Sequence, residues 1–295
     1  GCGEAGKQAW LFTGQGSQWP GMARSWYEAS PAFAQGLDRC LEVFQTLDSA
    51  FAEQLRTALV EPNSDLLQRM EYAQPAIVAF ELAMAAHWQA LGMAPDMVLS
   101  HSVGEFAAAV VAGHYSHEQV MPLVRRRGAL MDRCRGGAML SVFADEARVM
   151  PVAVRLGLDL AACNGERHLV FSGERELIAK LATELEGMGV RSNPLAVTGA
   201  AHSRMLDPIL PEFRHAAGAL QARQSDIALI SGLTGEVVDA ARLNQADFWP
   251  RHMRNPVRFV QCLRKAIDDG ASLFLEMGPD ATLVGIGQRE MGAGA

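Results

Sequence analysis

The chain has 295 residues, of which 49% are hydrophobic and 20% are charged, and its formal net charge at pH 7 is −7. This composition predicts a globular protein with one large domain, or a large domain that carries a smaller one, and it excludes a disordered chain. An acidic balance disfavours nucleic acid as the main partner, because phosphate binding needs a basic face. No apolar run reaches the ~18–20 residues of a membrane helix.

The chain contains five cysteines, which are odd in number and scattered. That pattern fits neither a disulfide framework nor a zinc site, and free thiols are typical of a reducing compartment. The sequence opens without a signal-peptide pattern, and both ends resemble the cut ends of a longer chain. We therefore expect a cytoplasmic protein with no metal and no bound cofactor.

In chain order, the first half is predicted to alternate short buried strands with helices. Its predicted elements are a strand over 9–12, a glycine loop over 13–18, a mostly helical stretch to about 91 in which a buried helix over 76–91 starts at Pro75, a strand over 97–99 and a helix over 103–112.

From about residue 137 the pattern changes to a β-α-β-β-α-β order, which is the ferredoxin-like arrangement. The predicted elements are strands over 138–143, 158–163, 168–172 and 190–197 and helices over 146–156 and 174–188. We predict an α/β protein in which residues 135–198 form a small ferredoxin-like subdomain. It would be inserted into a large α/β-hydrolase-like catalytic core made of 1–134 and 199–295, with a closing strand over 272–276.

The segment from Leu99 to Glu105 has the order strand, tight turn, helix of small residues. This is the arrangement of a nucleophile elbow, which usually reads G-x-S-x-G. Ser102 would be the nucleophile, Gly104 occupies the second glycine position, and Ser100 replaces the first. Amide N–H groups at the helix start favour a developing oxyanion. The alternative is a serine that only caps a helix.

A nucleophilic serine needs a base, and His202 is the strongest candidate. It follows a predicted strand and the small residues 198–201, at a place where a loop side chain can reach a site. A loop histidine that only contacts water is the alternative. The acidic candidates for a third triad member, Asp132, Asp145 and Asp159, lie at helix ends or in the inserted unit, and none is persuasive.

Three consecutive arginines, Arg125 to Arg127, precede Gly128 and two apolar residues. A charge run is usually a solvated face. Because the residues after Arg127 are small and apolar, this arginine could instead turn inward beside the nucleophile. There it would bind a carboxylate through two nitrogen atoms.

Eight short motifs follow one another along the chain. They are GQGSQ at 14–18, YAQPA at 72–76, HSVGE at 101–105, RGALM at 127–131, CNG at 163–165, AHS at 201–203, NPVRF at 255–259 and EMGP at 276–279. In this order they resemble malonyl-CoA:acyl-carrier-protein transacylases, and more closely the acyltransferase domains of modular polyketide synthases. The resemblance runs from about Trp10 to Gly287.

The resemblance implies an enzyme that moves an acyl group from coenzyme A to the phosphopantetheine thiol of an acyl carrier protein. Ser102 would carry the acyl group, and His202 would act as base and later as acid. The backbone N–H groups of Gln15 and Val103 would form the oxyanion hole. Arg127 would hold the free carboxylate of a malonyl-type group.

In this family a backbone carbonyl, not an acidic side chain, orients the histidine, and the matching position is His252, three residues before Asn255. The residues implied to line the acyl pocket are Gln74, His101, Asn164 and Ala201. Neighbouring synthase domains would be further partners. Arg125 and Arg126, with Arg133 and Arg135, would form a basic patch for an acidic carrier protein, or else a solvated face.

The acyl group is indicated by two motifs that disagree. Val103 and the YAQPA run are similar to the malonyl pattern. The four residues Gly199 to His202 read GAAH, whereas relatives carry HAFH for malonyl and YASH for methylmalonyl. Ala201 leaves room near the α-carbon, and one methyl group changes binding by only ~1–3 kcal/mol. We expect malonyl-CoA; the alternatives are methylmalonyl or a bulkier extender, a serine esterase, and a carrier-docking domain without catalysis.

Overall fold

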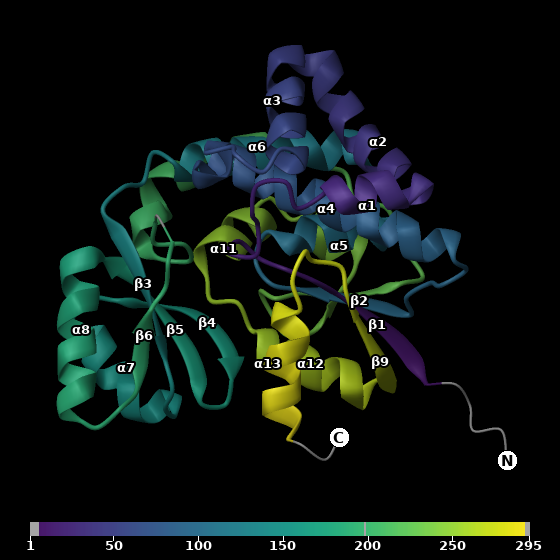
Figure 1. The fold of residues 1–295 in the computed structure, drawn as a ribbon. Coiled ribbons are helices and arrows are strands. Elements are labelled where there is room, and N and C mark those ends of the chain that lie inside the picture. Colours follow the sequence, from purple (N-terminus) through teal and green to yellow (C-terminus); the bar gives the residue numbers. More distant parts are fainter. Residues whose placement is uncertain (1–5, 198, 293–295) are drawn as a thin grey trace, which may run out of the picture.

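The computed structural model describes residues 6–197 and 199–292. Two separate sheets, each with its own helices, make up the molecule (Figure 1). None of the helices within these ranges has the length and apolarity needed to cross a membrane.

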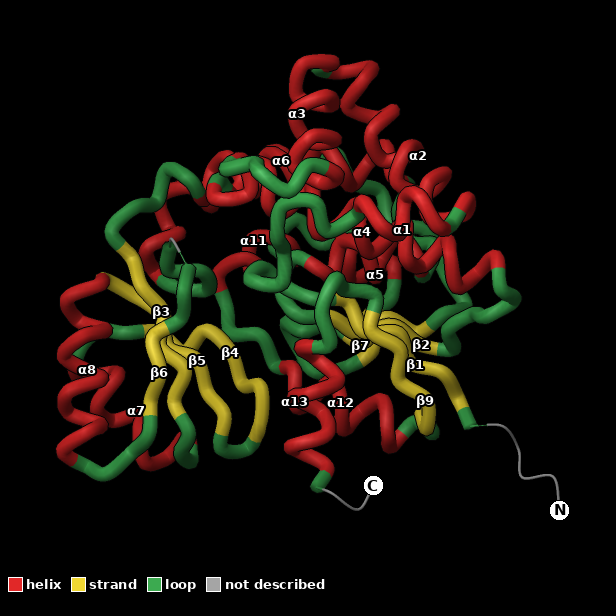
Figure 2. Tube along the Cα trace, viewed as in Figure 1, coloured by secondary structure: helices red, strands yellow, loops and turns green. Residues whose placement is uncertain are grey.

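The larger sheet has five strands in the order β8-β7-β2-β1-β9 (Figure 2). Its strands are β1 (Lys7–Phe12), β2 (Met97–Ser100), β7 (Ala228–Ile230), β8 (Val237–Val238) and β9 (Ala271–Glu276). All pairs are parallel except β7 with β8. The central strands are apolar runs because helices cover both faces of a parallel sheet. Phe12 pairs with Ser100, so the loops that follow β1 and β2 emerge side by side.

Eleven α-helices and two 3-10 helices surround this sheet within the described residues. They are α1 (Arg24–Ala29), α2 (Pro31–Leu47), α3 (Ser49–Val60), η1 (Leu66–Gln68), α4 (Met70–Ala90), α5 (Gly104–Val111), α6 (His117–Met131), η2 (Arg204–Ile209), α9 (Leu210–Ala217), α10 (Ala240–Leu243), α11 (Phe248–Arg254), α12 (Phe259–Asp268) and α13 (Thr282–Met291).

The predicted start of the buried helix at Pro75 is wrong, because α4 begins at Met70 and contains the proline. The carboxylate of Asp132 accepts the N–H groups of Met70 and Glu71 at 2.9 and 3.0 Å. These are two of the donors that a helix start leaves without a partner. The anchor lies about sixty residues further along the chain, so no local pattern signals it.

The smaller sheet is antiparallel, with the order β4-β5-β3-β6. Its elements are β3 (Gly137–Val142), α7 (Glu146–Arg155), β4 (Asp159–Gly165), β5 (His168–Glu174), α8 (Arg175–Gly187) and β6 (Ser192–Pro194). Both helices lie on one face of this sheet (Figure 1). The α/β fold with a large and a small unit is confirmed, including the β-α-β-β-α-β order.

The predicted strand over 190–197 is too long, because β6 spans only Ser192–Pro194 and pairs only with β3. Beyond it, Leu195 and Val197 line a cavity instead of continuing the sheet. The division into 1–134 with 199–295 and 135–198 stays our proposal. It is supported by the separate apolar core of the small unit, and its boundary residue 198 lies outside the described ranges.

A short segment after α11 joins the two units. The N–H of Val257 donates to Ala161 at 2.9 Å, and its carbonyl accepts from Cys163 at 2.8 Å, both on β4. The N–H of Arg258 donates to the carbonyl of Gly232, which follows β7, at 2.7 Å. This segment therefore bonds to both units beside the loops that follow β1 and β2.

Candidate active site

Ser102 and His202 meet between the two units, as predicted. Ser102 Oγ lies 2.7 Å from His202 Nε2. Both residues have positive φ, 51° and 55°, and no other non-glycine residue in the described ranges does. Residues other than glycine rarely adopt this backbone conformation, and it persists where surrounding contacts impose it. The strain therefore falls on the two residues that the sequence singled out.

The turn that carries Ser102 is held against the end of β1. The N–H of His101 donates to the carbonyl of Phe12 at 2.8 Å. A Cβ at Gly104 would lie 2.4 Å from the carbonyl oxygen of Thr13 and 2.6 Å from that of Phe12. Only glycine permits this approach between α5 and β1.

Ser100 replaces the first glycine of the elbow pattern without disturbing it. The side chain is fully buried, and its Oγ donates to Glu105 Oε2 at 3.3 Å. The extra hydroxyl therefore has a partner beneath the turn.

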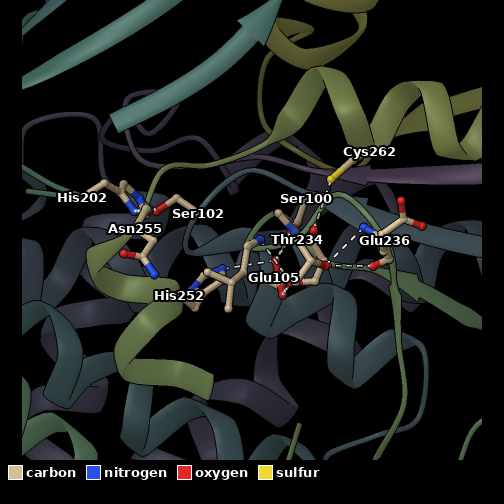
Figure 3. Close-up of polar contacts among 12 residues, drawn as sticks. Ser100, Ser102, Glu105, His202, Thr234, Glu236, His252, Asn255 and Cys262 are labelled. Atoms are coloured by element: carbon tan, nitrogen blue, oxygen red, sulfur yellow. Dashed lines mark hydrogen bonds and ion pairs between the residues drawn. The ribbon is translucent and has the colours of Figure 1, made fainter. Parts of the chain in front are cut away.

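The prediction that the backbone carbonyl of His252 accepts the hydrogen bond that orients His202 is wrong. The Nδ1–H of His202 donates to the carbonyl of Asn255 at 2.8 Å, whereas His252 points its Nε2 at Glu105 (Figure 3). Asn255 caps the end of α11 with an extended backbone, so its carbonyl leaves the helix and is free to accept. A carbonyl accepts only, so Nδ1 carries the proton and Nε2 is left to accept from Ser102.

The surroundings keep the imidazole of His202 neutral. Burial, followed by the charge of Arg127, lowers the pKa of His202 well below its ordinary value. Charging a buried imidazole beside a guanidinium is unfavourable. At neutral pH His202 can therefore accept a proton from Ser102.

None of the three acidic residues considered for a triad reaches His202. Asp132 caps α4. Asp159 bonds Arg204, and Asp145 lies 3.8 Å from Arg167. The carbonyl of Asn255 takes the place that an acid holds in an esterase triad.

Arg127 turns inward, as predicted, and is only 1% exposed. Its Nη1 donates to Gln74 Oε1 at 2.8 Å, and its Nη2 donates to Ser102 Oγ at 3.4 Å. Its Nε has no partner among the described residues. Burial lowers the pKa of Arg127 to about 10, so the guanidinium is still charged at pH 7.

Three of the four arginines of the predicted basic patch, which also included Arg135, pair with acidic side chains of this chain. Arg125 bonds Asp48 and Glu71, and Arg126 and Arg133 both bond Glu212. These contacts favour a neutralised helix face over a free basic patch.

A cavity of about 350 Å³ opens beside Ser102. The predicted residues that line it are Gln15, His101, Ser102, Arg127, Asn164, Ala201 and His202. His101 Nε2 donates to Asn164 Oδ1 at 2.9 Å, which joins the elbow to β4. Gln74 lies behind Arg127, and its Nε2 contacts Met131 Sδ at 3.2 Å.

The two predicted backbone donors, Gln15 and Val103, lie in the turns after β1 and β2, and of these two residues Gln15 lines the cavity. Neither Gln15 N–H nor Val103 N–H donates to a backbone carbonyl within the described part of the chain. The loop of Gln15 starts at Thr13, whose N–H and Oγ1 both donate to Glu81 Oε1.

The sequence analysis missed Met70, Glu81 and Glu105. Met70 fills the space beside Gly199, where an added Cβ would lie 2.9 Å from its Cε. Glu81 had a signal, since it is the one acid in the apolar run 75–86 and a buried carboxyl needs partners. Glu105 belongs to the HSVGE motif, but the sequence predicted no role for it.

Comparison with known proteins gives the family. The acyl transferase domain family matches residues 9–293. The phenolphthiocerol synthesis polyketide synthase Pks15/1 of Mycobacterium marinum is 38% identical over 286 residues, 96% of this chain and 13% of that protein. The spectinabilin polyketide synthase protein NorB of Streptomyces orinoci is 39% identical over 295 residues, 98% of this chain and 13% of that protein.

Solved structures agree with these sequence matches. The acyltransferase domain from the second module of the salinomycin polyketide synthase has a TM-score of 0.90 and 36% identity, over 97% of this chain and 66% of that one. The acyl transferase domain of SpnD, in complex with 2-(pent-4-yn-1-yl)malonyl, has a TM-score of 0.89 and 29% identity, over 99% of this chain and 70% of that one. Because the family match covers nearly the whole chain and its relatives are polyketide synthases, the chain belongs to the acyl transferase domain family and is an acyltransferase of the polyketide synthase type.

Proposed function

We propose that this domain moves a malonyl-type acyl group from coenzyme A to Ser102 and then to the phosphopantetheine thiol of an acyl carrier protein. It would do so in the cytoplasm as part of a larger synthase. The chain spans 13% of the polyketide synthases it matches, so its donor, carrier and neighbouring domains are part of this proposal.

The observation that carries the proposal is the charge of Arg127 beside the nucleophile. A buried cation without an anionic partner is costly. Burial lowers the pKa of Arg127, and no acidic side chain in residues 6–197 and 199–292 offsets this effect. A substrate carboxylate in the cavity would supply that partner through two hydrogen bonds. An esterase for neutral esters has no need of such a group.

In the first half-reaction, Ser102 Oγ would attack the thioester carbonyl while His202 Nε2 takes its proton. The N–H groups of Gln15 and Val103 are suited to stabilise the oxyanion. Collapse breaks the carbon–sulfur bond, and the coenzyme A sulfur leaves with the proton from His202. An acyl-serine ester remains.

In the second half-reaction, the carrier thiol would give its proton to His202 and attack the ester carbonyl. The carbon–oxygen bond breaks, and Ser102 recovers its proton from His202. The Asn255 carbonyl would hold the imidazole in one tautomer throughout. The product is an acyl thioester on the carrier protein.

Acyl-enzyme formation tests the first half. After incubation with malonyl-CoA, intact-mass measurement is expected to show one malonyl group on the wild type and none on Ser102→Ala. His101→Asn, which keeps a hydrogen-bonding side chain beside Asn164, is the control and is expected to be labelled. Labelling of Ser102→Ala would contradict the assignment.

The extender is tested by competition between equal amounts of malonyl-CoA and methylmalonyl-CoA. We expect malonyl to predominate on Ser102. Dominant methylmalonyl loading would favour the alternative extender, for which Ala201 leaves room. The SpnD domain is in complex with a substituted malonyl group, so a coenzyme A thioester with a bulkier substituent is included in the competition.

A serine esterase or thioesterase is the remaining alternative. Fast release of free malonate from malonyl-CoA without a carrier protein would support it. Under the proposal, the acyl-enzyme is expected to persist until a phosphopantetheine-bearing carrier is added. A carrier protein without its phosphopantetheine arm is the matched control.

A further inference from the structure

A buried carboxylate lies directly beneath the nucleophile elbow. Glu105 is the second residue of α5 and is fully buried. Its two oxygens accept from His252 Nε2 at 3.1 Å, Ser231 Oγ at 2.5 Å, Gly232 N–H at 2.8 Å and Ser100 Oγ at 3.3 Å. The four donors come from three parts of the chain, which converge on this carboxylate (Figure 3).

His252 is the donor that connects this carboxylate to the catalytic base. It lies on α11 and is 3% exposed. Its Nδ1 has no partner among the described residues, so the contact with Glu105 is its one side-chain hydrogen bond there. Nε2 is the donating atom whether or not the ring is charged.

α11 has seven residues and is capped at its end by Asn255, which lies three residues, about one helical turn, beyond His252. A helix this short does not hold its own position and depends on tertiary contacts. The carbonyl of Asn255 is the group that holds His202 Nδ1. Any shift of α11 relative to α5 would therefore change the direction in which His202 Nε2 points relative to Ser102 Oγ.

We propose that the Glu105–His252 pair positions the catalytic base by fixing α11 to α5, the helix that follows the nucleophile. This inference rests on the proposed roles of Ser102 and His202 in acyl transfer. The pair connects the two catalytic residues. Ser102 lies three residues before Glu105, and Glu105 accepts a hydrogen bond from His252. His252 lies three residues before Asn255, whose carbonyl accepts from His202. Both residues are positioning residues, because neither touches the acyl group.

A role in stability alone does not account for the polar character of the Glu105–His252 pair. Replacing a buried ion pair by apolar side chains of similar volume is often neutral for stability. α11 already has an apolar anchor, since Trp249 stacks on Phe106 with ring centroids 4.1 Å apart. What the polar pair adds is a directional contact one turn before the carbonyl that orients His202.

The test compares His252→Ala, His252→Gln and Glu105→Gln with the wild type. The single-turnover rate of malonyl-serine formation is measured against malonyl-CoA concentration. Misplacing a catalytic group by about 1 Å costs up to ~10²-fold, so we expect His252→Ala to lower the maximal rate ~10–100-fold. Half-saturation is expected to change little, because Arg127 and the cavity are untouched. A glutamine amide can donate to Glu105, so His252→Gln is expected to recover most of the rate.

Tyr115→Phe is the matched control. It removes the 3.2 Å hydrogen bond from Trp249 Nε1 to Tyr115 Oη, which is a buried contact of the same helix on another side. We expect a comparable loss in Tm from Tyr115→Phe but a near wild-type acylation rate. Equal slowing by Tyr115→Phe and His252→Ala at equal Tm would overturn the inference.

A spectroscopic readout separates this inference from the proposed function. In protein labelled with ¹⁵N-histidine, the Nδ1–H of His202 reports its hydrogen bond to Asn255 without any substrate. We expect the position of this signal to shift in His252→Ala and to be unchanged in Tyr115→Phe and in Glu105→Gln, whose amide oxygen can still accept from His252 Nε2. A wild type that takes up no malonyl group would refute the proposed function alone. An unmoved signal together with an unchanged rate in His252→Ala would refute the positioning role alone. If His252→Ala does not fold, the same two measurements on His252→Leu, which keeps an apolar side chain of similar size but removes the donor to Glu105, decide.

Discussion

The proposed contribution of Arg127 to acylation can be tested separately from that of Arg126. It is buried beside Ser102 with Gln74 as its polar support. Arg126, the preceding residue on α6, is exposed and bonds Glu212. One helix thus presents a buried arginine beside Ser102 and a surface arginine in succession.

We expect Arg127→Ala to reduce acylation by malonyl-CoA ~10²–10³-fold, because losing a charged, bidentate partner costs ~2–5 kcal/mol. Acylation by acetyl-CoA, which has no free carboxylate, is expected to fall far less. The ratio of the two rates, measured by intact mass over time, is the readout. Arg126→Ala is expected to leave the ratio unchanged. An unchanged ratio in Arg127→Ala would remove the carboxylate role.

Glu81 holds the start of the loop that carries Gln15. Burial raises the pKa of Glu81 well above its ordinary value, which shifts this carboxyl toward its neutral form. A neutral acid and a glutamine offer Thr13 the same carbonyl acceptor. We therefore expect Glu81→Gln to keep acylation within ~3-fold and Glu81→Ala to lower it ~10–100-fold. A Glu81→Gln variant as slow as Glu81→Ala would indicate that the charged form is required.

At the scale of elements, the elbow depends on how closely α5 approaches β1. A Cβ at Gly104 would meet backbone oxygens of Phe12 and Thr13, which cannot turn aside as a flexible side chain can. The helix must therefore shift to admit a methyl group, and Ser102 would shift with it.

We expect Gly104→Ala to cost about 1–3 kcal/mol of unfolding free energy and to slow acylation, measured by urea denaturation and by intact mass. Gly187→Ala, at the end of α8, is the control because nothing lies within 4 Å of its added Cβ. That variant is expected to be neutral or slightly stabilising. A fully active, stable Gly104→Ala variant would show that the close approach is not needed.

At the scale of the whole molecule, half-buried histidines in both units make stability depend on pH. Burial above all lowers the pKa of His117, on α6, and of His168, on β5, to about 4. In the unfolded chain the pKa of histidine is ~6.5. Between these values the unfolded state binds protons that the folded state does not.

We therefore expect the unfolding free energy to fall as the pH drops from about 6.5 to about 4. The measurement is a series of urea unfolding curves at pH 7.5, 6.5, 5.5 and 4.5. Replacing His117 and His168 together by glutamine is expected to flatten this dependence, because it removes two groups that take up protons on unfolding. An unchanged slope would show that neither histidine accounts for it.

The sequence by itself determined the features that local patterns encode. Glycines and apolar runs placed most of the individually predicted strands and helices within one or two residues, and the β-α-β-β-α-β order emerged from alternation along the chain. Ser102, His202 and Arg127 became candidates because of the residues around them, and their proposed roles came from the eight motifs that resemble acyltransferase domains.

Only the tertiary structure decided which groups meet from a distance. Asp132 sets the start of α4 from another helix, and Asn255 replaces His252 as the partner of His202. The physical reason is that a backbone carbonyl is present at every residue, so its role depends on where a helix ends in space and not on residue type. Glu105 and Glu81 were missed for a related reason: a buried carboxyl is defined by the donors around it, and chain folding brings those together.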